Sequence, residues 1–276
     1  MEKLAMHRPL STLLAAAFTL VVADPAAAAS KRFCDTYQSG KESVLLLIDR
    51  TSAGRPEQAV VAAASEAVLG RVAGDALRPE RMTLTNGILA PGQHLEVSTL
   101  SGSVSQRKVL YDDCRPGRAA SWTNIVDRPL DPIMVARQDR DFAAEVSAAI
   151  DKEMSKPVST KDSALIDTLA RVSRDYSEGA IKKVVIASDL LENVLVTLLP
   201  KKGKPQVLTE DELREALRTV AVKNGFASVK GAEVIVFGFG VDDRDRSRLD
   251  PDAERIIERF WRSYFQQSGA TFRANP

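Results

Sequence analysis

The sequence predicts an α/β protein with a doubly wound, mostly parallel sheet, helices on both faces and one antiparallel edge strand. Apolar runs at 44–48, 183–188 and 232–238 are short and do not alternate, which is typical of strands buried on both faces of a parallel sheet. Segments with helical periodicity separate these runs, as in βαβ units. The chain of 276 residues is 44% hydrophobic, enough for one such domain.

Residues 1–29 are similar to a secretory signal peptide. A basic start precedes an apolar run over 10–22, and the alanines at 26–29 suit cleavage. An uncleaved anchor is the alternative, but the run is short for a membrane span of about 20 residues. We therefore expect 30–276 to be a single exported domain, periplasmic or secreted, whose mature form does not span the membrane.

The first half of this domain contains one buried strand, one helix and one strand pair. An alanine-rich helix is expected over 57–69, after the strand at 44–48, and Gly70 can end it. The segment at 94–100 alternates apolar and polar residues, and 106–111 is a second, more polar strand. These two strands are expected to pair antiparallel at the sheet edge.

The second half continues the alternation of helix and strand. An amphipathic helix is expected over 139–154, and a second helix follows Ser159 and Thr160, either of which can cap it. The strand at 183–188 comes next. A capping box at Thr209–Glu212 then opens another helix, which leads to the strand at 232–238.

A last helix and a short strand close the chain. Asp250 is expected to cap this helix, with Pro251 in its first turn. Its buried face carries aromatic residues, among them Phe260 and Trp261. Residues 270–272 are expected to add a final short strand.

The cysteines and the charge restrict the class of protein. Cys34 and Cys114 are the only two cysteines, and in an exported protein a lone pair favours a disulfide over two thiols. A metal-binding or catalytic thiol pair is the alternative, without a CxxC spacing to support it. The net charge is +1, so the chain lacks the basic excess that binding to nucleic acid needs.

Two strands end on acids. Asp49 follows the first buried strand and Asp189 follows the strand at 183–188. If these strands are parallel neighbours, both carboxylates lie at the carboxyl end of the sheet, where open α/β sheets bind their ligands. Two carboxylates there predict either a divalent cation or a polar network.

These residues carry a family resemblance. Asp49–Ala53 after a strand, the hydroxyls at Ser159 and Thr160, and Asp189 after a later strand resemble the von Willebrand factor A family. Its metal-ion-dependent adhesion site combines a DxSxS motif, a threonine from another loop and a later aspartate. The resemblance covers nearly all of 40–275 in element order. It implies a metal at the top of the sheet, completed by a partner's carboxylate.

The resemblance assigns Asp49, Thr51, Thr160 and Asp189 as ligands of Mg²⁺, with Ser159 and Ser163 as rivals of Thr160. Oxygen ligands of this kind suit Mg²⁺. The sequence departs from the motif at Ala53, which has no hydroxyl. The other interpretation is a degenerate, metal-free site, in which loop hydroxyls, backbone donors or an arginine hold the acids. Arg50 and Arg55 are the candidate arginines.

The segment after Asp189 is unusually apolar for a loop above a sheet. One interpretation is an exposed patch that docks a partner, formed by Leu190, Leu191, Glu192 and Asn193 together with Arg50 and Arg55. The other is that the segment packs on the domain.

Two hypotheses of function follow. The first is an exported, non-catalytic interaction module that binds another envelope or secreted protein through the loops at the carboxyl end of the sheet. The alternative is a metal-assisted hydrolase or phosphatase that uses Asp49 and Asp189. A Ser-His-Asp triad would have to use His94, and no GxSxG elbow accompanies it. The glycines at 238 and 240 lack the third glycine of a dinucleotide fingerprint.

Overall fold

The structure is a computed structural model. It describes residues 32–37, 41–51, 58–73, 83–85, 87–100, 107–117, 131–158, 162–198, 209–242 and 247–276, all within the unit Lys31–Pro276. The expected signal peptide at 1–29 lies outside the described residues. Among the helices that are described, none combines the length and the apolar character that crossing a bilayer requires.

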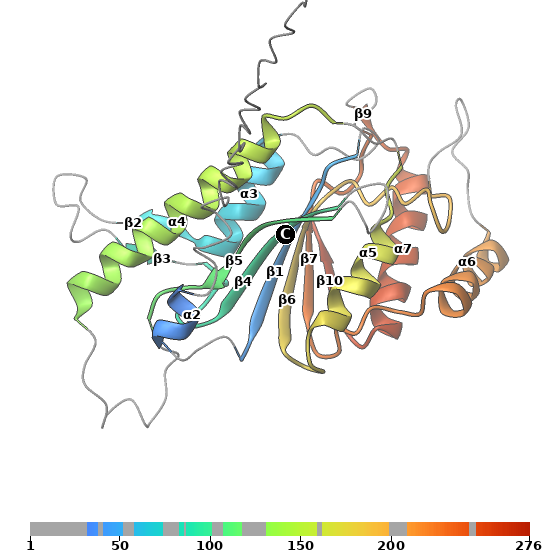
Figure 1. The fold of residues 1–276 in the computed structure, drawn as a ribbon. Helices are drawn as coiled ribbons and strands as arrows, with labels where there is room; N and C mark the ends of the chain where they lie inside the picture. Colours follow the sequence, from blue (N-terminus) through green and yellow to red (C-terminus); the bar gives the residue numbers. More distant parts are fainter. Residues whose placement is uncertain are drawn as a thin grey trace, which may run out of the picture. The chain divides into compact units, whose positions relative to one another are not determined.

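A six-stranded sheet forms the centre of the domain (Figure 1). Its strand order is β10-β7-β6-β1-β4-β5, and every neighbouring pair is parallel except β4 and β5. The strands are β1 (Ser43–Asp49), β4 (His94–Leu100), β5 (Lys108–Cys114), β6 (Ile181–Ala187), β7 (Glu233–Phe237) and β10 (Thr271–Ala274). This arrangement confirms the predicted fold class. The chain order reverses between β1 and β6, which makes their carboxyl ends the topological switch point of the sheet.

Helices cover both faces of the sheet (Figure 1). On one face lie α2 (Arg32–Tyr37), α3 (Gln58–Leu69) and α4 (Pro132–Met154). On the other lie α5 (Leu165–Val172), α6 (Glu210–Lys223) and α7 (Pro251–Gln267). A 3₁₀ turn, η4 (Ser173–Asp175), continues α5. Each face therefore has its own hydrophobic core.

The central strand β1 contributes to both cores. Leu45 and Leu47 pack on the α5–α7 side, whereas Val44, Leu46 and Ile48 pack on the α3–α4 side. All five are at most 1% exposed. Because successive side chains of a strand alternate between faces, an uninterrupted apolar run is what such a central position requires.

Several boundaries differ from the sequence prediction. β4 pairs in parallel with β1, so of the expected strand pair β5 alone lies at an edge, and the polar positions of β4 are buried as well. α4 begins at Pro132 rather than near 139, because Asp131 caps it and Pro132 suits the first turn. Two small ribbons were not predicted: β2 (Arg71–Ala73) with β3 (Thr83–Thr85), and β8 (Val241–Asp242) with β9 (Ser247–Arg248).

The predicted disulfide between Cys34 and Cys114 is present and joins α2 to the end of edge strand β5. The buried Asp113 beside it accepts hydrogen bonds from the amides of Phe33, Cys34 and Cys114. Although Asp113 and the two sulfurs lie close together, both thiols are consumed by the bridge, which excludes them as metal ligands. The bridge thus anchors the N-terminal arm to the sheet.

Candidate functional site

The two strands that were expected to carry the acids are neighbours. β1 and β6 pair in parallel, with Ile48 opposite Ala187, so Asp49, the last residue of β1, lies beside Ser188, which follows β6. The Ser188 hydroxyl donates a hydrogen bond of 2.9 Å to Asp49 Oδ2. The acid-bearing ends of both strands therefore meet at the switch point.

Four donors converge on the Asp49 carboxylate. Oδ1 accepts from the backbone amide and the hydroxyl of Thr51, both at 2.9 Å. Oδ2 accepts from the hydroxyl of Ser188 at 2.9 Å and from that of Ser163 at 3.1 Å. We call these four residues the Asp49 cluster. Each of them is fully buried, so the cluster joins β1, β6 and the segment before α5 beneath the surface.

Burial raises the pKa of Asp49 to about 6, although the hydrogen bonds from Thr51, Ser188 and Ser163 lower it. Desolvation disfavours the charged carboxylate, and the converging donors offset only part of that penalty. The raised pKa marks Asp49 as the member of the cluster whose charge changes in mildly acidic solution.

Asp189 orders the turn that follows β6. Its Oδ1 accepts a 2.9 Å hydrogen bond from the amide of Leu191. Between them Leu190 has a φ of 63°, in the left-handed region that residues other than glycine seldom adopt. The indole of Trp261 donates to the Leu190 carbonyl at 2.9 Å, which holds the strained turn against α7.

Glu192, which the sequence interpretation assigned to partner binding, caps a helix instead. The N-cap position of α5 is Ala164, whose side chain cannot accept a hydrogen bond. Glu192 Oε2 accepts from the amide of Ile166 at 3.0 Å, and Oε1 accepts from Val194 and Leu195. Burial raises its pKa to about 7, while these backbone donors lower it. Glu192 is therefore a cap supplied from another part of the chain.

The proposed exposed patch after Asp189 is mostly buried. Leu190, Leu191 and Glu192 have no exposed surface, because the two leucines enter the α5–α7 core. Asn193 is half-buried and accepts a 2.6 Å hydrogen bond from the amide of Ser163. The alternative interpretation, that this segment packs on the domain, describes the arrangement found. Only Val194, with 51% exposure, offers a large apolar side chain to solvent in this described segment.

Of the two candidate arginines, the structure describes Arg50. Arg50 is buried and donates to the carbonyl of Lys156 at 2.7 Å, just beyond the end of α4. Arg55, Ala53 and Thr160 lie outside the described residues. Of the hydroxyls proposed before α5, Ser163 is the one that the structure places on Asp49.

The hydrogen bonds of Asp49 compete with a Mg²⁺ ion for its oxygens. The oxygens of Asp49 are occupied by four hydrogen bonds, whereas a cation needs those lone pairs for itself. The four residues of the cluster are also fully buried, so their oxygens are not on the surface. In the described geometry, three hydroxyls and one backbone amide hold the acid.

A second polar group lies at the opposite end of the sheet. His94, at the start of β4, contacts Ser43 Oγ through Nδ1 at 3.2 Å and Asp112 through Nε2. Sequence spacing gave no sign of this group, which depends on the pairing of β1, β4 and β5. Ser43 is 2% exposed, so its hydroxyl cannot reach a substrate.

Fold and site together define a doubly wound α/β protein with a closed carboxylate–hydroxyl network at its switch point. No protein-family model matches the chain, and no curated protein matches it.

Proposed function

We propose that this protein is an exported, non-catalytic interaction module of the von Willebrand factor A-like type. It binds another envelope or secreted protein through the carboxyl end of its sheet. The observation that carries the proposal is the closed Asp49 cluster at the switch point. A network that joins two strands and the approach to α5 gives a rigid base for the connections above it, which is what a recognition surface needs.

The same observation argues against the metal-assisted hydrolase. That reaction needs a carboxylate oxygen that is available to a metal, a water molecule or a substrate. Both oxygens of Asp49 are already hydrogen-bonded and buried. His94, the one histidine of the expected mature chain, lies at the other end of β4 and offers no base to this end of the sheet.

The disulfide supports the exported location. A bridge between Cys34 and Cys114 is stable in an oxidising compartment such as the periplasm and uncommon in the cytosol. The signal-peptide pattern at 1–29 points to the same compartment.

Val194 provides the test of the binding surface. It is exposed on the segment that follows β6, at the carboxyl end of the sheet. We expect Val194→Glu to abolish cross-linking to the native partner in the periplasm and to leave the melting temperature unchanged. Val222→Glu is the matched control, because this valine is 80% exposed. It lies near the end of α6 that leads into the start of β7, away from the carboxyl end of the sheet.

Loss of cross-linking in both variants, or in neither, would remove this surface from consideration.

A titration with Mg²⁺ distinguishes the interaction module from the hydrolase. The interaction module predicts a melting temperature that does not depend on Mg²⁺ and no hydrolysis of a generic phosphoester. Turnover that disappears in Asp49→Asn would instead establish the hydrolase.

A further inference from the structure

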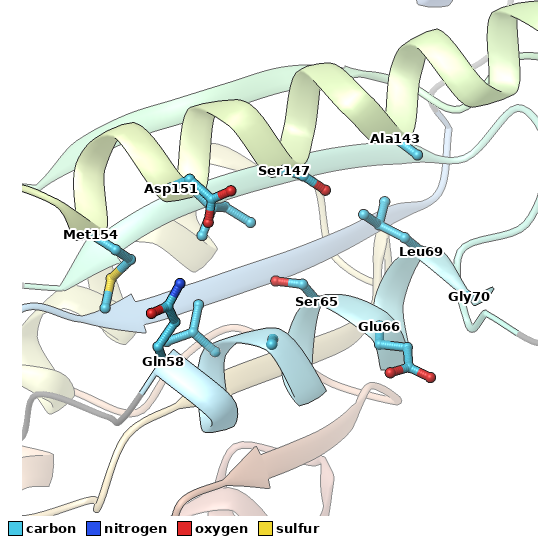
Figure 2. Close-up of a pocket in the computed structure, with 12 residues that line it drawn as sticks. Gln58, Ser65, Glu66, Leu69, Gly70, Ala143, Ser147, Asp151 and Met154 are labelled. Atoms are coloured by element: carbon cyan, nitrogen blue, oxygen red, sulfur yellow. The ribbon is translucent and has the colours of Figure 1, made fainter. Parts of the chain in front are cut away.

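A cavity of about 300 Å³ lies between α3 and α4, on the face of the sheet away from Glu192 and α5. Figure 2 shows the two helices running antiparallel on either side of it. On the α3 side, its lining residues run from Gln58 to Gly70. This volume is at the lower end of the range found for small-molecule sites.

The cavity combines an apolar floor with polar groups along its walls. Four buried side chains form the floor: Val61, Leu69, Ile150 and Met154. Ser65 and Ser147 face each other across the middle (Figure 2). The Ser65 hydroxyl oxygen is buried, and the described residues provide it with no hydrogen-bond partner. A buried hydroxyl left in this state favours a ligand that brings a polar hydrogen.

The charge of the lining indicates the sign of the ligand. Its described charged residues are two acids, Glu66 and Asp151, and no basic residue belongs to it. Glu66 pairs with Arg71 outside the cavity. Asp151, which is exposed on α4, extends toward the space between the two helices (Figure 2). A carboxylate above an apolar floor is complementary to a cation on an aliphatic stem.

We propose that this cavity binds a small aliphatic primary amine. The ammonium group donates to the Asp151 carboxylate, while the alkyl chain covers the floor formed by Val61 and Ile150. The cavity lies on the α3–α4 face of the sheet, whereas the segment that carries Val194 packs on the α5–α7 face, so each proposal is tested by its own variants.

Hexylammonium is the probe, measured by isothermal titration calorimetry with the purified protein. We expect saturable binding that is at least about tenfold weaker for hexanol and absent for hexanoate, since only the ammonium forms a charge-assisted hydrogen bond with Asp151. Asp151→Asn should weaken hexylammonium binding about tenfold. Asp141→Asn is the matched control: it changes an exposed acid on the same helix that does not line the cavity, and it should leave binding unchanged.

Ser65→Leu fills the cavity and should abolish binding, with the melting temperature confirming that the variant folds. Equal affinity for hexanoate and hexylammonium would overturn the proposal. So would the absence of hexylammonium binding, or unchanged binding in Asp151→Asn.

Discussion

At the scale of single residues, the chemical nature of the hydrogen-bond partners decides what each buried acid tolerates. Asp49 Oδ2 faces the hydroxyls of Ser163 and Ser188, which can donate or accept. Glu192 faces backbone amides, which can only donate. A side-chain amide, which donates and accepts, can therefore satisfy its partners at position 49, whereas at position 192 its NH₂ group would face donors.

We predict that the stability of the protein falls as the pH rises from about 4 to about 6, in proportion to the raised pKa of Asp49. In this window the native carboxyl holds a proton that the unfolded chain has released, so the native state binds more protons. The effect is about 2–3 kcal/mol between pH 4 and pH 7, and it is constant at higher pH.

Urea unfolding of the wild-type protein and of Asp49→Asn measures this effect. The introduced side-chain amide can accept from Thr51 and donate to the two serine hydroxyls, so the variant should lie within about 1 kcal/mol of the wild type at pH 5. Because the amide does not titrate, the difference between the two proteins should change with pH. Parallel pH profiles would show that Asp49 stays ionised throughout.

At the scale of elements, two helices have N-termini capped by acids from other elements. Asp113 serves α2 and Glu192 serves α5, whereas α6 has its own capping box at Thr209 and Glu212. The local cap was predicted because both partners lie within one turn. Glu192 was assigned to partner binding, because a cap 26 positions away from Ile166 leaves no local signal.

Glu192→Gln should destabilise the protein by about 2 kcal/mol, because the amide NH₂ would face the Ile166 amide and leave a buried donor unsatisfied. Glu215→Gln on α6 is the control. It breaks only an exposed pair with Arg218 and should change the free energy of unfolding by less than about 0.5 kcal/mol. Equal losses in both variants would contradict the capping role.

At the scale of the whole molecule, the order of the strands places the site. The strand predictions at 44–48, 183–188 and 232–238 needed only uninterrupted apolar runs, and Asp49 and Asp189 followed from where two of these runs end. That Ser163 and Ser188 donate to Asp49 depends on how β1, β6 and the approach to α5 meet in space. Position in the chain alone could not show that Ser163 reaches Asp49.

The disulfide acts at this scale too, since it closes a separation of 80 residues between α2 and β5. In the chain-entropy model, such a bridge limits the freedom of the unfolded chain and stabilises the fold by about 4 kcal/mol. We expect the free energy of unfolding, measured in urea, to be lower by about this amount in the double variant Cys34→Ser and Cys114→Ser. The same loss should follow addition of dithiothreitol to the wild-type protein. A loss below about 1 kcal/mol would show that Asp113 alone holds the arm.

The indole of Trp261 donates a hydrogen bond to the carbonyl of Leu190, whose backbone is strained. The fluorescence of Trp261 can therefore report on the conformation of this turn. The ring is fully enclosed, so its fluorescence should be blue-shifted. Trp122, the other tryptophan, is first replaced by phenylalanine so that only Trp261 emits. A change at the carboxyl end of the sheet that relaxes the turn at Leu190 should then shift the emission of Trp261 to longer wavelength.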